Sequence, residues 1–341
     1  MASTEHYLPQ FLLRGFATKR DGRHVYQFRR GGQPHLVSVR NVAGERNFYG
    51  TVGAVDVEGS LHSRESEYAP LVERLRQVDG PTAERDKQSI DALVLHLLAR
   101  GRHIRDSAID IAKSAIEASR QALADVQYRD QLLERLVRSA LQNPRFIELS
   151  RGQPPELQQQ AIALIRLQIR KGLESGTIGA LGEKFIAELV GKFDLREMAR
   201  TGQGDALLRE PATRVPRAGL AHLVWSVRHR STGQYILGDV GVLAQSSGVA
   251  DLSIVFRAAG NLTALLMPIS SSALLVGSSA SGRPVDDETT NLASTELSRV
   301  FFLAAANRPR EAAYFARLGT RAAAFDDSLT EGIVRRALEE K

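Results

Sequence analysis

The sequence predicts an α+β fold in which an N-terminal β-hairpin and a small, mostly antiparallel C-terminal sheet surround a large helical middle, with further helices towards the C-terminus. Three patterns predict this class: strand-like alternation at 23–39, helical periodicity from about 55 to 200, and short β-branched runs at 220–276. The predicted parts of one integrated fold are an N-terminal block at 1–50 that packs on the C-terminal sheet, a helical middle at 51–204, and the sheet with C-terminal helices at 205–341.

The hairpin is predicted from residues 23–39. Residues 23–29 alternate in the manner of a half-buried strand, Gly31 and Gly32 supply a turn, and 34–39 forms the partner strand. A loop with an aromatic end follows at 40–50. Eight Lys and Arg residues face three acidic residues in the first fifty, and this asymmetry indicates an acidic partner such as nucleic acid.

The helical middle shows apolar residues three, four and seven apart. One helix begins near 55 and ends near the turn at 79–81, and Thr82 then caps a long buried helix that continues towards 112. Further helices are predicted at 115–142, 156–173 and 180–200.

Short strand candidates and three helices complete the chain. Residues 220–227 and 234–237 are predicted to form a hairpin around the turn at 231–233. The remaining strand candidates are 240–244, 253–256, 262–267 and 273–276, and the helices are 288–306, 309–317 and 326–340.

The composition predicts a soluble protein of the reducing cytoplasm. Of the 341 residues, 43% are hydrophobic and 25% charged, and no apolar run approaches the roughly 18 residues that a membrane helix needs. The start lacks the pattern of a secretory signal. Without cysteine there is no disulfide, no zinc–thiolate site and no cysteine nucleophile. The common phosphate-loop, dinucleotide, metalloprotease and serine-hydrolase motifs are absent as well.

The opening stretch, residues 6–16, combines polar side chains with apolar anchors. His6 is a candidate for proton transfer, because imidazole titrates near neutral pH. Tyr7, Gln10 and Arg14 could orient it or hold an anionic substrate. The structural alternative is that His6 and Gln10 fix the first segment against buried backbone groups.

Two carboxylates complete the candidate site. Glu45, with Arg40 and Arg46, is either a catalytic carboxylate beside phosphate-binding arginines or a surface ion pair worth ~0–1 kcal/mol. Asp239 lies between glycines at a strand end, where it either points into a cleft or forms an Asx-type turn.

Arg100 and His103 invite comparison with helical ribonucleases that use an arginine and a histidine about a turn apart. Their spacing is one short of the usual minimum, and the alternative is a solvated helix end with Arg102 and Arg105. A solvated helix face also accounts for Glu65.

The opening motif, His6-Tyr7-x-Pro9-Gln10-x-x-Leu13-x-x-Phe16, resembles the start of a bacterial family known as domain of unknown function 4238. The likeness continues in order through 38–49, which follows the hairpin, through a helix like 57–70, and through the strand that contains Trp225. The resemblance implies an α+β fold whose N- and C-terminal pieces meet around a helical middle. It brings no established activity.

The chain departs from this family at two places. Residues 238–241 look like a turn that is Ser-Asp-Asn-Pro-like in the family. Only Asp239 of that pattern is kept here, so any site at this turn is reduced to one carboxylate. Residues 268–271 look like a strand that is Pro-Leu-Ser-Pro-like in the family. Residues 100–102 stand where the family usually has an Arg-Thr-Pro-like stretch.

Together these residues lead to the hypothesis of an effector that cleaves or handles phosphodiesters of RNA, of the kind found in bacterial defence or toxin systems. Its cleft would lie between the opening motif and the C-terminal sheet. The predicted catalytic residues are His6 or Glu45 for proton transfer and Asp239, which would orient a base or bind a divalent ion. The predicted substrate ligands are Tyr7, Gln10, Arg14 and Arg40. Magnesium or manganese is the candidate cofactor. The alternative is a non-catalytic module in which the same residues are structural and the helical middle binds a protein partner, and pocket binding of a small molecule or nucleotide is a third class.

Overall fold

The computed structural model describes residues 4–46, 48–49, 57–124, 129–182, 184, 194–208, 220–249, 251–255 and 262–322. The chain divides into two compact units. Unit 1 comprises Met1–Ala108 and Arg196–Ala324, and unit 2 comprises Ile109–Leu195 and Phe325–Lys341. The boundary falls inside the predicted helical middle, so the first helices of that middle belong with the sheets.

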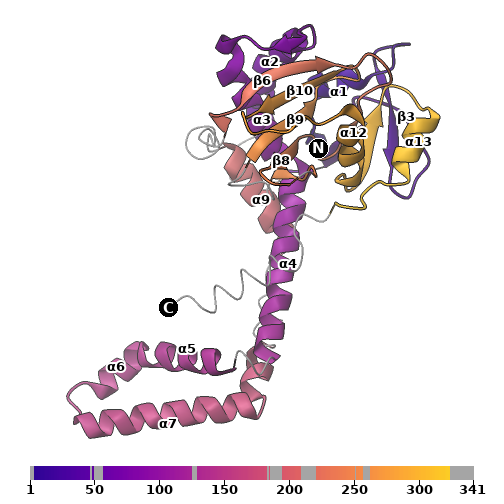
Figure 1. Ribbon diagram of the computed structural model, residues 1–341. Coiled ribbons are helices and arrows are strands. Elements are labelled where there is room, and N and C mark those ends of the chain that lie inside the picture. The colour runs from indigo at the N-terminus through magenta and orange to yellow at the C-terminus, as the bar shows by residue number, and fades with distance from the viewer. Residues whose placement is uncertain are drawn as a thin grey trace. The chain divides into compact units, whose positions relative to one another are not determined.

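The larger sheet of unit 1 has the strand order β5-β6-β10-β9-β8, and all neighbouring strands are antiparallel (Figure 1). In that order the strands are Gly80–Pro81, Val224–His229, Ala273–Ser278, Leu262–Pro268 and Leu243–Ser246. The indole N–H of buried Trp225 in β6 donates a hydrogen bond of 2.7 Å to Asp91 in α3 (Lys87–Arg100). This bond fixes α3 against the sheet.

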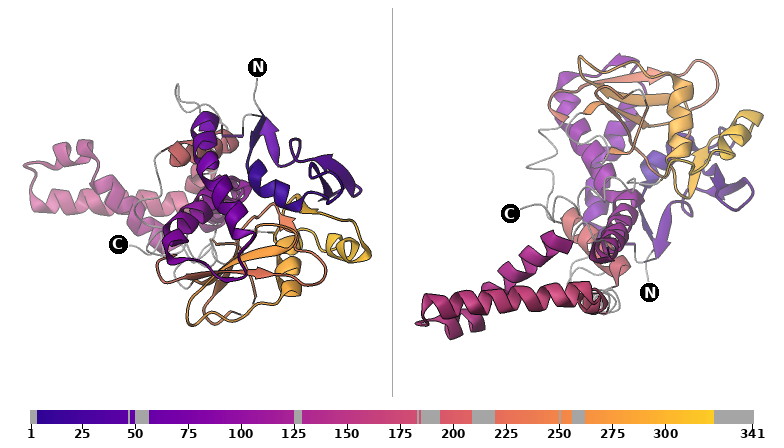
Figure 2. Two further views of the ribbon diagram at one scale, coloured as in Figure 1. Left: turned by 90° about the horizontal axis from the view of Figure 1, so that it is seen from above. Right: turned by 60° about the horizontal axis from the view of Figure 1, so that its bottom comes forward.

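The second sheet joins the two ends of unit 1 in the order β3-β2-β11-β7. Its strands are His35–Ser38, His24–Arg29, Phe301–Ala304 and Leu237–Gly238, again antiparallel. Phe28 and Phe302 stack with their ring centroids 4.5 Å apart and form a core with Ile236 and Tyr314. Figure 2 shows the N-terminal hairpin beside the C-terminal strand and helix. The predicted hairpin and the predicted fold class are confirmed.

A helix assignment and a strand pairing from the sequence are wrong. The predicted helix at 288–306 ends early as α12 (Asp287–Glu296), and Phe301–Ala304 forms the central strand β11, all four residues of which are buried. A short apolar run without alternation is consistent with either a helix or a buried strand. Residues 234–237 are not the hairpin partner of β6, since β7 pairs with β11 and β6 pairs with β10.

The opening stretch forms β1 (Thr4–His6), α1 (Gln10–Leu13) and the 3-10 turn η1 (Arg14–Phe16). β1 pairs antiparallel with β4 (Gly44–Arg46), inside the segment predicted to be a loop. The carbonyl of Pro9 accepts bonds from the N–H groups of Leu12 and Leu13, which begins the helix. Leu12, Leu13 and Phe16 are fully buried and anchor it.

Arg76, just after α2 (Val57–Leu75), holds the opening stretch to the C-terminal sheet. Its guanidinium donates to the carbonyls of Phe11 at 2.9 Å and of Ile269 at 2.9 Å, and also to that of Leu12. The carbonyl of Gly15 accepts the N–H of Ser271, and a Cβ on Gly15 would lie 2.5 Å from the Ile269 carbonyl oxygen. The opening motif and the turn between β9 and β10 therefore meet closely.

The remaining helices are η2 (Glu84–Asp86), α4 (Arg102–Ala124), α5 (Arg129–Leu141), α6 (Pro144–Ser150), α7 (Pro155–Glu174), α9 (Leu195–Leu208) and α13 (Pro309–Phe315). In unit 2, α5 and α7 pack through a cluster centred on Leu133, Val137 and Leu173. Residues 183 and 185–193 of one predicted helix, and the whole predicted helix at 326–340, lie outside the described residues. Of the described helices, none is both long and apolar enough to cross a membrane.

Candidate functional site

A cleft of about 270 Å³ opens beside the opening stretch in unit 1, and we call it the opening cleft. Its lining residues come from β1, α1 and η1, from α2, and from the end of α3. Its polar lining residues are His6, Gln10, Arg14, His62, Glu65, Ser66 and Arg100. Three of the predicted site residues thus share one cleft, which faces helices and not the C-terminal sheet as predicted.

His6 is held at both its backbone and its ring. Its ring Nε2 lies 3.0 Å from the carbonyl oxygen of Arg40, and its own carbonyl accepts a bond of 2.6 Å from Arg100 Nε. Because a carbonyl only accepts, Nε2 carries the proton in this bond. Burial lowers the pKa of His6, more strongly than the Arg40 carbonyl raises it, and the charge of Arg100 lowers it further. His6 is therefore neutral at pH 7.

Arg100 and Glu65 form a buried ion pair at the base of the opening cleft. The side chain of Arg100 is only 1% exposed and pairs with Glu65, which is 18% exposed. The expectation of a solvated helix end is therefore wrong for Arg100, as is that of a solvated face for Glu65. His103 is buried too, and the backbone turns at Gly101 (ψ 139°), so Arg100 and His103 stand on separate helices.

The remaining polar groups of the cleft are more open. Arg14 and His62 are exposed, and Gln10 is half-buried at the start of α1. Within the described part of the chain, the Arg14 guanidinium has no carboxylate partner. The cleft thus presents one open cation, while the charges of Arg100 and Glu65 offset each other.

Glu45 is bound by α4 and not by its sequence neighbours. Its carboxylate lies 3.2 Å from Arg102 and 2.8 Å from Arg105, whereas the sequence suggested Arg40 and Arg46. The guanidinium of Arg105 also lies 4.2 Å from the ring centre of Phe48. Glu45 therefore ties β4 to the first turn of α4, outside the lining of the opening cleft.

Asp239 forms a second polar centre, which we call the carboxylate clamp. Its side chain is 1% exposed and accepts the backbone N–H groups of Arg299, Val300 and Phe301 at 2.9, 2.7 and 3.3 Å. The Nε2 atom of His103 lies 3.6 Å from the same carboxylate. Both carboxylate oxygens are thus occupied by the segment that leads into β11.

The neighbour of Asp239, Gly238, has no room for a side chain. A Cβ there would overlap the hydroxyl of Ser298 and the carbonyl oxygen of Ser294, and the Gly238 N–H donates to the Ser294 hydroxyl. This close approach to α12 accounts for glycine where the related turn has serine.

Tyr7 and Arg40 lie apart from the lining of the opening cleft. The Tyr7 ring is buried and stacks on Phe48 at 5.0 Å. Burial and the nearby Asp239 charge raise the pKa of Tyr7. Arg40 is exposed and contributes its carbonyl to His6, but its side chain is not part of the lining.

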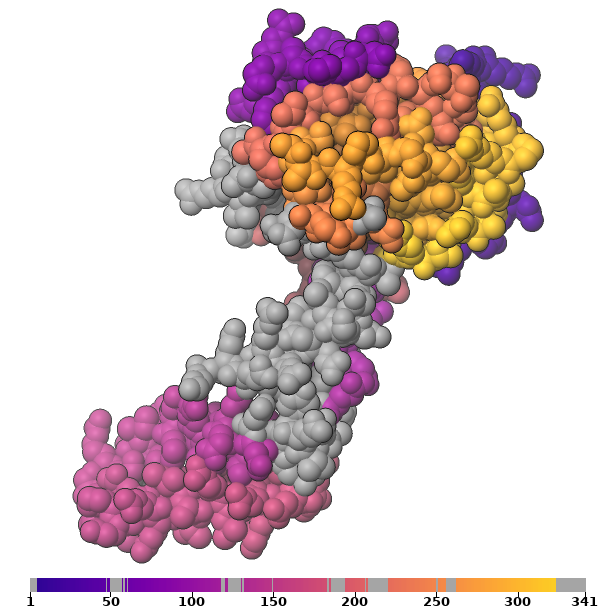
Figure 3. Space-filling view, in the orientation of Figure 1, coloured from indigo at the N-terminus to yellow at the C-terminus, as the bar shows by residue number. Residues whose placement is uncertain are grey.

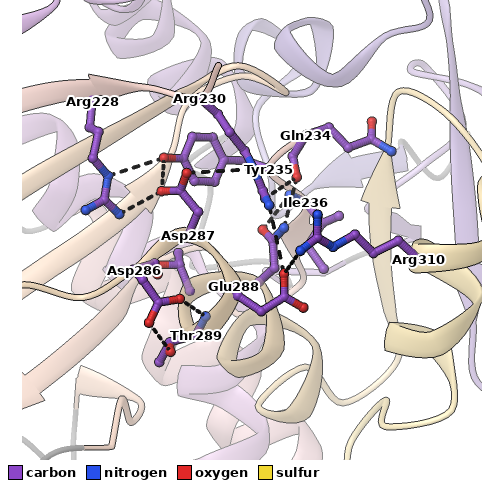
Figure 4. A network of polar contacts seen from close by, with 12 residues as sticks. Arg228, Arg230, Gln234, Tyr235, Ile236, Asp286, Asp287, Glu288, Thr289 and Arg310 are labelled. Carbon is purple, nitrogen blue, oxygen red and sulfur yellow. Dashed lines mark hydrogen bonds and ion pairs between the residues drawn. The ribbon is translucent and has the colours of Figure 1, made fainter. Parts of the chain in front are cut away.

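A further charged network surrounds the start of α12 (Figure 4). Asp287 lies 2.5 Å from the Tyr235 hydroxyl and 3.0 Å from Arg228, and Glu288 accepts from Arg310 and Tyr314. Burial first, and then the bond to Asp287, raise the pKa of Tyr235 to about 12. Each carboxylate is paired within the network, which indicates a structural role for this centre.

Sequence reasoning missed four polar residues of the opening cleft as members of the same site as His6, namely His62, Glu65, Ser66 and Arg100. No local pattern links them to His6, since they stand 56 or more residues further along the chain, in two other helices. Among the described residues, no group of three or more His, Cys, Asp or Glu side chains is arranged to hold a metal ion.

The space-filling view in Figure 3 shows the α2 and α3 region, in purple, bordering the salmon and orange surface of the larger sheet.

A comparison with family models matches residues 5–302 to the family described as "Protein of unknown function (DUF4238)". No curated protein and no solved structure matches the chain.

Proposed function

The chain belongs to the DUF4238 family, and on that premise we propose that the opening cleft binds a phosphate group of RNA and cleaves a phosphodiester bond there. One observation carries the proposal: His6, an imidazole held neutral by burial, lines the same cleft as Arg14, an exposed guanidinium. A neutral imidazole accepts a proton, and a guanidinium holds a phosphate through two parallel bonds.

Each residue of the opening cleft has a distinct role in this proposal. His6 transfers the proton, Arg14 holds the phosphate, and the Gln10 amide donates to a phosphate or ribose oxygen. Arg40 stays a predicted phosphate ligand beside His6. Glu45 and Asp239 are not used, because arginines and backbone N–H groups already bind their carboxylates.

The test is incubation of the purified full chain with an RNA oligonucleotide, with magnesium, with manganese and with a chelator. We expect cleavage by the unaltered chain and a loss of about 10²–10⁴-fold in kcat for His6→Ala, the range typical of general acid–base catalysis. Arg14→Ala should weaken RNA binding. Because the neutral form of His6 is the active one, activity should fall as pH drops through its lowered pKa.

His35→Ala is the matched control, because His35 is an exposed histidine of β3 outside the cleft. It should cleave like the unaltered chain. Equal cleavage by the unaltered, His6→Ala and His35→Ala proteins would overturn the proposed role of His6, and no binding of RNA at all would overturn the function.

A second candidate is a non-catalytic interaction module, favoured by the two hydrogen bonds that tie His6 to Arg40 and Arg100. In that case His6→Ala lowers the thermal unfolding temperature of unit 1 by several degrees and changes no activity. Under the leading proposal the unfolding temperature changes little, because catalytic groups contribute little to stability.

A further inference from the structure

We propose that His62 is the second proton-transfer residue of the opening cleft and that the reaction there uses the ribose 2′-hydroxyl of RNA as its nucleophile. This inference rests on the proposed function and deepens it, because it names both the substrate class and the product. It starts from the presence of two imidazoles, His6 and His62, in one cleft with Arg14.

The hydrogen bonds of His6 assign its role. Its Nε2 donates to the Arg40 carbonyl, which leaves the lone pair of Nδ1 as the only basic position on the ring. No hydrogen bond occupies Nδ1 among the residues that the structure describes. Burial disfavours the protonated form of His6, so this residue is the proton acceptor.

His62 has the opposite setting. It is exposed on the second turn of α2 and lines the opening cleft, whereas His6 lines the cleft from β1. Histidine is the side chain that most often serves as a general acid or base, and His62 is the second imidazole of the opening cleft. His62 is therefore the group that can donate a proton to a leaving oxygen.

The charges in the cleft fit a substrate with a phosphodiester. Arg14 offers the open guanidinium, and the Arg100–Glu65 pair leaves no uncompensated carboxylate to repel a phosphate. A phosphate bound in the cleft would have imidazoles from two separate elements, β1 and α2, available as base and acid. That arrangement serves an in-line displacement at phosphorus.

The reaction balances without a further reactant. His6 Nδ1 takes the proton of the 2′-hydroxyl, the O2′–P bond forms, the P–O5′ bond breaks, and protonated His62 gives its proton to O5′. The products are a 2′,3′-cyclic phosphate and a free 5′-hydroxyl. DNA has no 2′-hydroxyl and cannot react in this way.

The experiment uses the full chain and three oligonucleotides: all RNA, all DNA, and DNA with one ribonucleotide. We expect cleavage of the RNA, cleavage of the chimera only on the 3′ side of its ribonucleotide, and no cleavage of the DNA. The new ends should be a 2′,3′-cyclic phosphate and a 5′-hydroxyl. Cleaved DNA, or a 5′-phosphate end, would overturn this inference and leave the proposed function standing, whereas no cleavage and no RNA binding would overturn both.

The role of His62 is separated from a merely structural one by a substrate with sulfur in place of O5′. Thiolate leaves without being protonated, so His62→Gln should lose at least about 10²-fold on ordinary RNA and recover most of the rate on the sulfur substrate. His6→Gln should be slow on both, and His35→Gln fast on both. Full activity of His62→Gln on ordinary RNA, or equal loss on both substrates, would contradict the assignment.

Discussion

The opening cleft and the carboxylate clamp differ in how much hydrogen-bonding capacity their polar groups have left. In the clamp, three backbone N–H groups bind a carboxylate that is 1% exposed. In the cleft, one nitrogen of His6 and the whole guanidinium of Arg14 are available. Buried polar groups in proteins are nearly always paired, so the clamp is ordinary for a folded interior. The comparison shows that unused hydrogen-bonding capacity, and not residue type, distinguishes a candidate binding site from a structural contact.

The largest effect is expected for Asp239→Ala, which removes the acceptor of three backbone N–H groups. We expect a loss of about 3–5 kcal/mol in the free energy of unfolding, because unpaired buried groups cost 1–3 kcal/mol each. The only tryptophan, Trp225, lies in unit 1, so its fluorescence during urea titration follows this unit. Exposed Asp251→Ala is the control, and equal stability of both variants would remove the distinction between clamp and cleft.

Arg76→Ala should have the next largest effect on stability. The variant leaves the carbonyls of Phe11, Leu12 and Ile269 without their donor, and we expect a loss of about 2–3 kcal/mol. Arg74 is the matched control, since it is 59% exposed and makes one ion pair, worth below about 1 kcal/mol. If both variants unfold at the same urea concentration, Arg76 does not hold the opening stretch in place.

His96 should make stability depend on pH. Burial first, and then the charge of Arg64, lower its pKa from 6.5 to about 4. A lowered pKa means that the unfolded chain binds the proton first, so this contribution to stability is complete above pH 6.5 and is lost as pH falls towards 4. The loss from His96 between pH 7 and pH 5 should be about 2 kcal/mol.

His96→Leu should remove that part of the pH dependence. Among the described residues, neither ring nitrogen of His96 has a hydrogen-bond partner, so leucine should cost little stability at pH 7. The measurement is urea unfolding of both proteins at pH 7 and pH 5. An unchanged slope in the variant would show that other groups dominate the acid side.

The smallest effect on stability is expected for Arg14→Ala, within about 0.5 kcal/mol, because the side chain is exposed and unpaired in the described part of the chain. The same variant should lose affinity for RNA and show a flatter dependence of binding on salt. Exposed Arg20→Ala is its control. A marked loss of stability in Arg14→Ala would contradict the proposed difference between the opening cleft and the carboxylate clamp.

The fold class follows from the sequence because its elements carry local signals. The alternation at 24–29, the capping of α12 by Asp286 and the cluster in α5 and α7 are all visible in short windows. β11 was missed because its four apolar residues gain strand structure only from β2 on one side and β7 on the other. Pairing between strands more than 60 residues apart leaves no local pattern.

The candidate site was predictable only in part for the same reason. His6, Gln10 and Arg14 lie within nine residues and could be read together, whereas the wall supplied by α2 comes from the tertiary fold. The sequence marks Asp239 by its place between glycines, but it indicated a cleft or an Asx-type turn and not the backbone donors that bind this carboxylate. Its three backbone donors, however, come from a segment 60 residues further along the chain.

The overlap at Gly238 has a consequence for variation within the family. Serine at this position and the hydroxyl of Ser298 compete for the same space, so one chain cannot keep both in the packing seen here. Because the Cβ would also overlap the backbone carbonyl of Ser294, relatives with serine at this turn are expected to have α12 shifted away from it, together with alanine or glycine at the place of Ser298. An alignment should show the two positions changing together, and exchanging both at once should cost less stability than introducing the serine alone.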